Sequence, residues 1–78
     1  MGEAPEKVYR VWRLRKQNHY VDACLRDVIE NHAAVVEVSF RYNGEVSYKR
    51  IWPSRDDAIA EAAAKRAELE REGWIPHW

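Results

Sequence analysis

The sequence predicts an α+β fold: an antiparallel sheet, as a four-stranded meander, with one C-terminal helix packed on one face. Three observations predict it. Polar and apolar residues alternate along much of the chain before residue 53, an Asn43-Gly44 dipeptide joins two alternating stretches, and a capped helical pattern follows. Within the 78 residues we expect residues 1–6 to form a disordered tail and residues 7–78 a single domain.

The first predicted strand, Val8–Arg15, mixes β-branched and aromatic residues with long basic ones. Alternation places Trp12 and Leu14 on one face of this strand. The other face receives Tyr9, Val11, Arg13 and Arg15. The polar residues 16–19 then form a turn.

The stretch from Tyr20 to Ala34 admits two interpretations. Its apolar residues recur at helical spacing, which favours an amphipathic helix, but no capping box opens it, since Val21 stands where an acid is expected after Asn18. As a strand followed by a loop from about Val28 to Ala33, it has two distinct faces. These faces are Val21, Ala23 and Leu25 on one side, and Tyr20, Asp22, Cys24 and Arg26 on the other. We favour the strand and loop because of a family resemblance given below.

A hairpin follows from Val35. Its first strand alternates apolar and polar side chains, and Asn43-Gly44 is typical of a type I′ turn, which needs positive φ at both positions. The return strand covers 45–52. Its two predicted faces are Val46, Tyr48, Arg50 and Trp52 on one side, and Ser47, Lys49 and Ile51 on the other.

A helix is predicted after Pro53. Ser54 can cap the amide three residues later, and Asp57 occupies the capping-box position. Gly73 ends the helix as a left-handed cap. One stripe is rich in alanine, so the helix can lie close to the aromatic residues of the sheet. The stripe comprises Ala58, Ile59, Ala62, Ala63 and Leu69.

Composition argues against several classes of protein. Cys24 is the one cysteine and cannot form an internal disulfide, which fits a reducing compartment. No apolar run approaches the roughly 20 residues of a membrane span. Residues 1–6 lack the apolar stretch of a signal peptide. We therefore expect a cytoplasmic protein without a membrane partner.

Catalytic motifs are absent from the sequence. The three glycines form no phosphate loop, and the histidines and Cys24 match no metal-ligand spacing. Cys24 with His19 or His32 would be the candidate nucleophile pair, but a small residue on a strand explains Cys24 better because no acid orients a base. We predict no enzyme activity, no catalytic residue, no cofactor and no metal.

One helix covers one sheet face, so the opposite face is the candidate binding surface. Residues 7–50 carry nine basic and five acidic residues, a net charge of +4 within a neutral chain. Basic side chains interleaved with aromatic ones suit contact with nucleic acid, although a mixed solvated face or a homodimer interface also fits. The candidate residues are Tyr9, Arg13, Arg15, Tyr20, Arg26, Arg41 and Lys49. The sequence thus predicts a small non-enzymatic binding or interaction module, with a nucleic-acid-binding protein as the alternative.

The C-terminal tail contains two tryptophans, Trp74 and Trp78. They could insert into a partner. We favour the interpretation that Trp74, with or without Trp78, folds back over the end of the core, as apolar residues after a terminal glycine often do.

Several segments carry a resemblance to known proteins. They are Cys24-Leu25-Arg26-Asp27, Val36-Glu37-Val38, Tyr42-Asn43-Gly44-Glu45, residues 50–55 and residues 65–74. The chain after Tyr20 resembles a group of short, uncharacterised bacterial proteins with a strand meander and a terminal helix ending in Gly-Trp. That resemblance implies a strand rather than a helix over 20–27, although the relatives turn directly after Leu-Arg-Asp. It implies no activity.

A looser likeness links the hairpin and helix to two DNA-binding folds. One is the N-terminal sheet-and-helix domain of tyrosine recombinases, and the other is the WGR domain of DNA-repair polymerases. The Trp-Gly-Arg triplet that names the second family is absent here. Both likenesses imply nucleic acid as a partner by analogy of fold alone.

Overall fold

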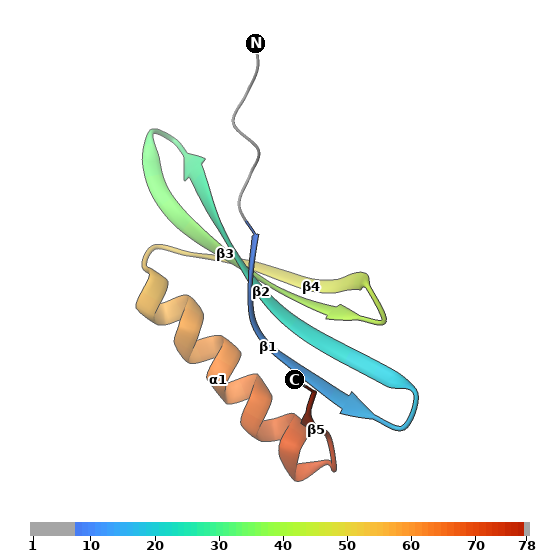
Figure 1. Ribbon diagram of the computed structural model, residues 1–78. Helices are drawn as coiled ribbons and strands as arrows, with labels where there is room; N and C mark the ends of the chain where they lie inside the picture. The colour runs from blue at the N-terminus through green and yellow to red at the C-terminus, as the bar shows by residue number, and fades with distance from the viewer. Residues whose placement is uncertain (1–7, 78) are drawn as a thin grey trace.

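The computed structural model describes residues 8–77 as an open antiparallel sheet with a single helix across one side (Figure 1). The strands lie in the order β4-β3-β2-β1-β5. Their bounds are β1 Val8–Lys16, β2 His19–Glu30, β3 Ala33–Tyr42, β4 Glu45–Trp52, α1 Arg55–Arg71 and β5 Ile75–Pro76. The predicted α+β fold is confirmed, with a short fifth strand added to the predicted four. The disordered tail predicted for 1–6 lies outside the described residues.

Two-residue turns join the four long strands. Asn43 and Gly44 have φ of 52° and 89°, as a type I′ turn requires, and Asn31 and His32 have φ of 50° and 65°. The predicted strand over 20–27 is confirmed, but the loop predicted from Val28 to Ala33 is wrong. Asparagine tolerates positive φ, so the chain can reverse at 31–32 without glycine. The pairing of β2 with β3 therefore continues through Val28↔Val35 to Glu30↔Ala33, next to the turn.

Two bulges change which side chains share a face. In β1 the pairing passes from Arg10↔Cys24 directly to Trp12↔Ala23, so Val11 is the extra residue. Tyr9 therefore lies opposite Leu25, on the side of the helix, where the guanidinium of Arg55 approaches its ring at 6.0 Å. The prediction that Tyr9 faces away from the helix is wrong, because alternation along β1 breaks at the bulge.

The second bulge lies in β4. Phe40 pairs with Tyr48 but Arg41 pairs with Val46, which leaves Ser47 as the extra residue. Val46 consequently faces away from the helix, contrary to the predicted grouping with Tyr48. The Ser47 hydroxyl donates to the carbonyl of Phe40 at 3.3 Å, which holds the bulge against β3.

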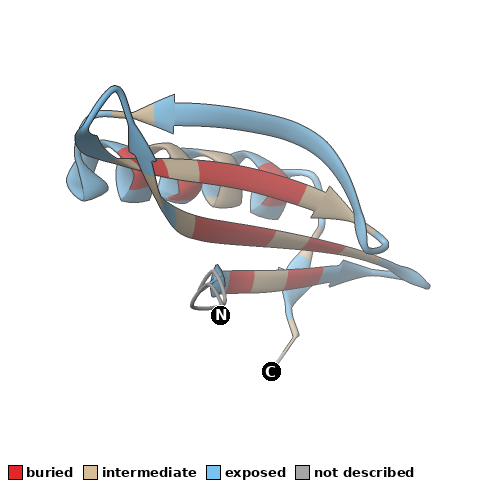
Figure 2. Ribbon diagram, turned by 90° about the horizontal axis from the view of Figure 1, so that it is seen from above, coloured by how far each residue is buried: buried red, intermediate tan, exposed pale blue. Residues whose placement is uncertain are grey.

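The core lies between the sheet and α1, where buried residues gather in the middle of β1, β2 and β3 (Figure 2). Ala58 and Ala62 are fully buried, and their small side chains let the helix approach the sheet. The indole Nε1 of Trp12 donates to the carbonyl of Ala62 at 2.9 Å, so the largest core residue also anchors the helix. The core comprises Trp12, Leu14, Val21, Ala23, Leu25, Val36, Val38, Phe40, Ala58, Ala62 and Leu69.

Both predicted helix ends are confirmed. The Ser54 hydroxyl accepts from the amide of Asp57 at 3.2 Å, and Gly73 follows the helix with φ of 100°. Trp74 then packs against the core, with its ring edge-on to Tyr42, so the predicted packing of Trp74 is confirmed. The prediction for Trp78 falls on a residue that the structure does not describe.

Candidate functional site

The sheet surface that faces away from α1, here called the open face, gathers most of the predicted binding residues. Arg13, Arg15, Tyr20, Arg26, Arg41 and Lys49 all belong to it by strand register. Tyr9 does not, and the β1 bulge brings Val8 and Arg10 to this side instead. Neither Val8 nor Arg10 carried a signal in the sequence, because a bulge leaves the residue types of a strand unchanged.

Two carboxylates in the middle of the open face are held by arginines. Asp22 Oδ1 lies 3.2 Å from Arg13 Nε and 3.8 Å from Arg10 Nε. Glu37 accepts a hydrogen bond from Arg26 Nη2 at 3.2 Å. Both carboxylates are largely buried, with side-chain exposures of 14% and 13%. Their negative charge is therefore largely neutralised by the guanidinium groups of neighbouring arginines.

The remaining cations of the open face have no carboxylate partner among the residues that the structure describes. Within residues 8–77, Arg15, Arg41 and Lys49 form no ion pair. The Nε of Arg41 is buried and donates no hydrogen bond to any described residue. The middle of the open face thus has a local surplus of positive charge.

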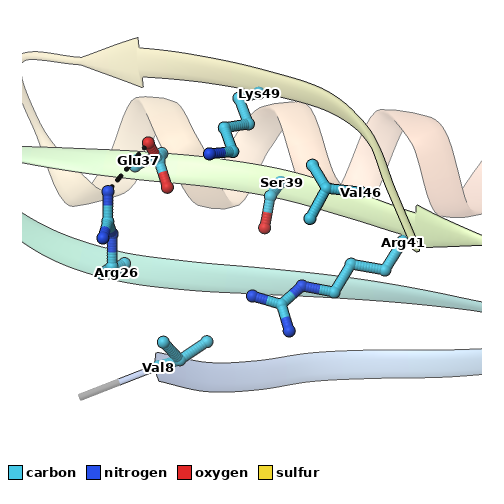
Figure 3. A pocket seen from close by; sticks show the side chains of 7 residues that line it. All are labelled: Val8, Arg26, Glu37, Ser39, Arg41, Val46 and Lys49. Carbon is cyan, nitrogen blue, oxygen red and sulfur yellow. Dashed lines mark hydrogen bonds and ion pairs between the residues drawn. The ribbon is translucent and has the colours of Figure 1, made fainter. Parts of the chain in front are cut away.

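A shallow hollow of about 190 Å³ lies where this surplus is found (Figure 3). Ser39 is only 4% exposed, and it pairs across the strands with another small buried residue, Cys24. Figure 3 shows Arg41 and Lys49 reaching over the sheet on either side of Ser39. Small side chains surrounded by long ones create the depression. Its lining consists of Val8, Arg26, Glu37, Ser39, Arg41, Val46 and Lys49.

A cluster of flat side chains lies at the end of the open face near the C-terminus. The Arg13 guanidinium carbon is 4.6 Å from the centroid of the Tyr20 ring, and the His77 ring meets Tyr20 edge-on at 5.0 Å. The His77 amide donates to the carbonyl of Arg13 at 2.9 Å, which ties the tail to β1. Sequence reasoning missed His77, because only the pairing of β5 with β1 brings it beside Tyr20.

The candidate nucleophile pair does not form. Burial raises the pKa of the Cys24 thiol above its usual 9.0, which disfavours the thiolate. His19 lies five residues before Cys24 along β2, about 16 Å away, and its Nδ1 is 3.2 Å from the Asn43 side-chain amide. His32 lies in the β2–β3 turn. Neither His19 nor His32 therefore lies beside Cys24 to act as its base.

Two further findings concern residues 8–77 only. No group of three or more histidine, cysteine, aspartate or glutamate side chains there could hold a metal ion. The single helix of this part of the chain is not long and apolar enough to cross a membrane.

Comparison with known proteins gives no family for this chain. No family model, no curated protein and no solved structure matches this chain. The resemblances to the Gly-Trp group, the recombinase domains and the WGR domain stay predictions. Function is therefore inferred from the open face.

Proposed function

We propose that the protein is a non-enzymatic binding module that binds nucleic acid through its open face. The observation that carries this proposal is a surplus of cations that form no ion pair with any described residue: Arg41 and Lys49 line the hollow, and Arg15 lies beside Tyr20 on the same face. Phosphate oxygens are the ligands such cations recognise, and phosphate contacts supply most of the non-specific affinity of proteins for nucleic acid.

The distribution of charge over the whole chain supports the same surface. The chain is neutral overall, and residues 55–72 carry six acidic and four basic residues. Positive charge on the open face and negative charge along the helix would orient an approaching polyanion toward the sheet. A uniformly mixed surface would give no such preference.

A homodimer through the same surface is less favourable. Packing two open faces together would bring their cations against one another. The outer edge of β4 is also poorly suited to pairing with a second copy, since it carries Lys49 and Arg50 and is bent by the bulge at Ser47. We therefore expect a monomer to bind the ligand.

The test is a titration of a fluorescently labelled oligothymidine of about 12 nucleotides at low salt, read by anisotropy. The Arg41→Gln/Lys49→Gln variant should bind at least about tenfold more weakly than the natural sequence, because two phosphate contacts are lost. The control variant Lys65→Gln/Arg66→Gln removes the same charge from the helix, where these residues pair with Glu68 and Glu70. It should bind normally. An equal loss in both variants, or no binding by the natural sequence, would refute the proposal.

A further inference from the structure

The hollow has a neighbour on the open face, the cluster formed by Arg13, Tyr20 and His77, here called the ring cluster. Arg41, which lines the hollow, lies opposite Asp22 in the β2–β3 register, and Asp22 is two residues from Tyr20 along β2. Two residues of a strand span about 7 Å, and Lys49, which the register places level with Ser39 and Cys24, lies about 13 Å along the sheet from Tyr20. A charged site and an aromatic site are therefore close enough to contact adjacent parts of one ligand.

The ring cluster has the properties of a stacking surface. Tyr20, Arg13 and His77 are each only partly buried. Tyr20 is held through both its backbone and its ring. Its backbone amide donates to the Asn43 side chain at 3.0 Å, Arg13 lies over the ring, and His77 meets its edge. An ordered aromatic group of this kind binds an unpaired base at a small entropic cost.

We infer that the open face is specific for single-stranded nucleic acid. A backbone phosphate would lie in the hollow beside Arg41 and Lys49, and a nearby base of the same strand would stack on the ring cluster. This inference rests on the proposed function and names its ligand class. In a duplex each base is stacked between its neighbours and offers no free ring face. The ring cluster would then add nothing to the affinity for a duplex, whereas a single strand could stack a base on it.

Three probes of equal length separate the contributions of charge and stacking: an oligothymidine, a deoxyribose-phosphate strand without bases, and a duplex. The natural sequence should bind the oligothymidine about tenfold more tightly than either of the others, which is the effect expected of one stacked base. Tyr20→Leu should lose that preference. Tyr20→Phe keeps the ring and should retain it.

The outcomes distinguish failure of the inference from failure of the proposed function. If none of the three probes binds at low salt, the proposed function is wrong. If all three bind equally and Tyr20→Leu binds like the natural sequence, the face binds phosphate alone and the inference is wrong. Unchanged affinity of Tyr20→Leu for the strand without bases shows that the variant is folded, so loss of oligothymidine binding then reports stacking.

Discussion

Replacing Asn43 tests how the β3–β4 turn fixes the position of Tyr20. Asn43 has a positive φ of 52°, its side-chain oxygen accepts from the Tyr20 amide at 3.0 Å, and its side-chain nitrogen lies 3.2 Å from His19 Nδ1. The side chain thus extends the pairing of β2 with β3 past Val21↔Tyr42. Turn conformation and the cross-strand hydrogen bond can be separated by two substitutions.

Asn43→Ala loses both contributions. A non-glycine residue with left-handed φ costs about 1 kcal/mol, and a hydrogen bond contributes about 1 kcal/mol, so we expect a loss of about 2 kcal/mol in the free energy of unfolding. Asn43→Gly tolerates the φ and loses only the hydrogen bond, about 1 kcal/mol. The order of stability should be asparagine, then glycine, then alanine.

Urea unfolding followed by fluorescence of the four tryptophans measures these differences. Asn31 is the matched control, since its φ of 50° is similar and it makes no side-chain hydrogen bond to any described residue. Asn31→Gly should change stability by only a few tenths of a kcal/mol. If Asn43→Ala is as stable as Asn43→Gly, or if neither differs from the natural sequence, the reasoning fails.

Three further predictions concern the core and its edges. Trp12→Phe should lower stability by about 1–3 kcal/mol in thermal denaturation, because the hydrogen bond to Ala62 is lost and a void remains; an unchanged melting temperature would contradict this. Cys24 should react slowly with a disulfide reagent in the native protein and quickly in urea, because it is buried and its thiol pKa is raised; rapid native labelling would be inconsistent with the fold. The hydrogen bond to Glu61 raises the pKa of Tyr48 above 10.0, so its contribution to stability is present below pH 10 and is lost as the pH rises through the folded pKa. Tyr48→Phe should therefore show a smaller alkaline loss of stability, and an ultraviolet titration that finds an ordinary Tyr48 pKa would contradict the assignment.

Local signals predicted the second half of the chain well. Asn43-Gly44 set the last hairpin, and Ser54 and Gly73 marked the two ends of the helix, because each acts through its own backbone geometry. The β2–β3 hairpin was predicted too short because no comparable local signal marks its turn. Its turn has no glycine, and Ile29, which is 73% exposed, resembles part of a helical stripe in sequence although it lies on a protruding pair of strands.

The candidate site was predicted only as far as strict alternation holds. Six of the seven expected residues lie on the open face, but the bulge at Val11 turns Tyr9 toward the helix. The bulge leaves the residue types of β1 unchanged, and the contacts of the adjacent Trp12 with Ala62 and Phe40 join residues far apart in the sequence, so strict alternation could not reveal it. His77 joins Tyr20 for a similar reason, because its place depends on how β5 docks.

The most direct test of nucleic-acid binding by the open face is the salt dependence of oligothymidine affinity. Arg15, Arg41 and Lys49, the three open-face cations without an ion pair to any described residue, predict a slope of about −2 for log affinity against log salt, or a loss of about 20-fold between about 50 and 200 mM. Arg41→Gln/Lys49→Gln should reduce the slope to about −0.7. Affinity that does not change with salt, or a slope that both proteins share, would contradict the account.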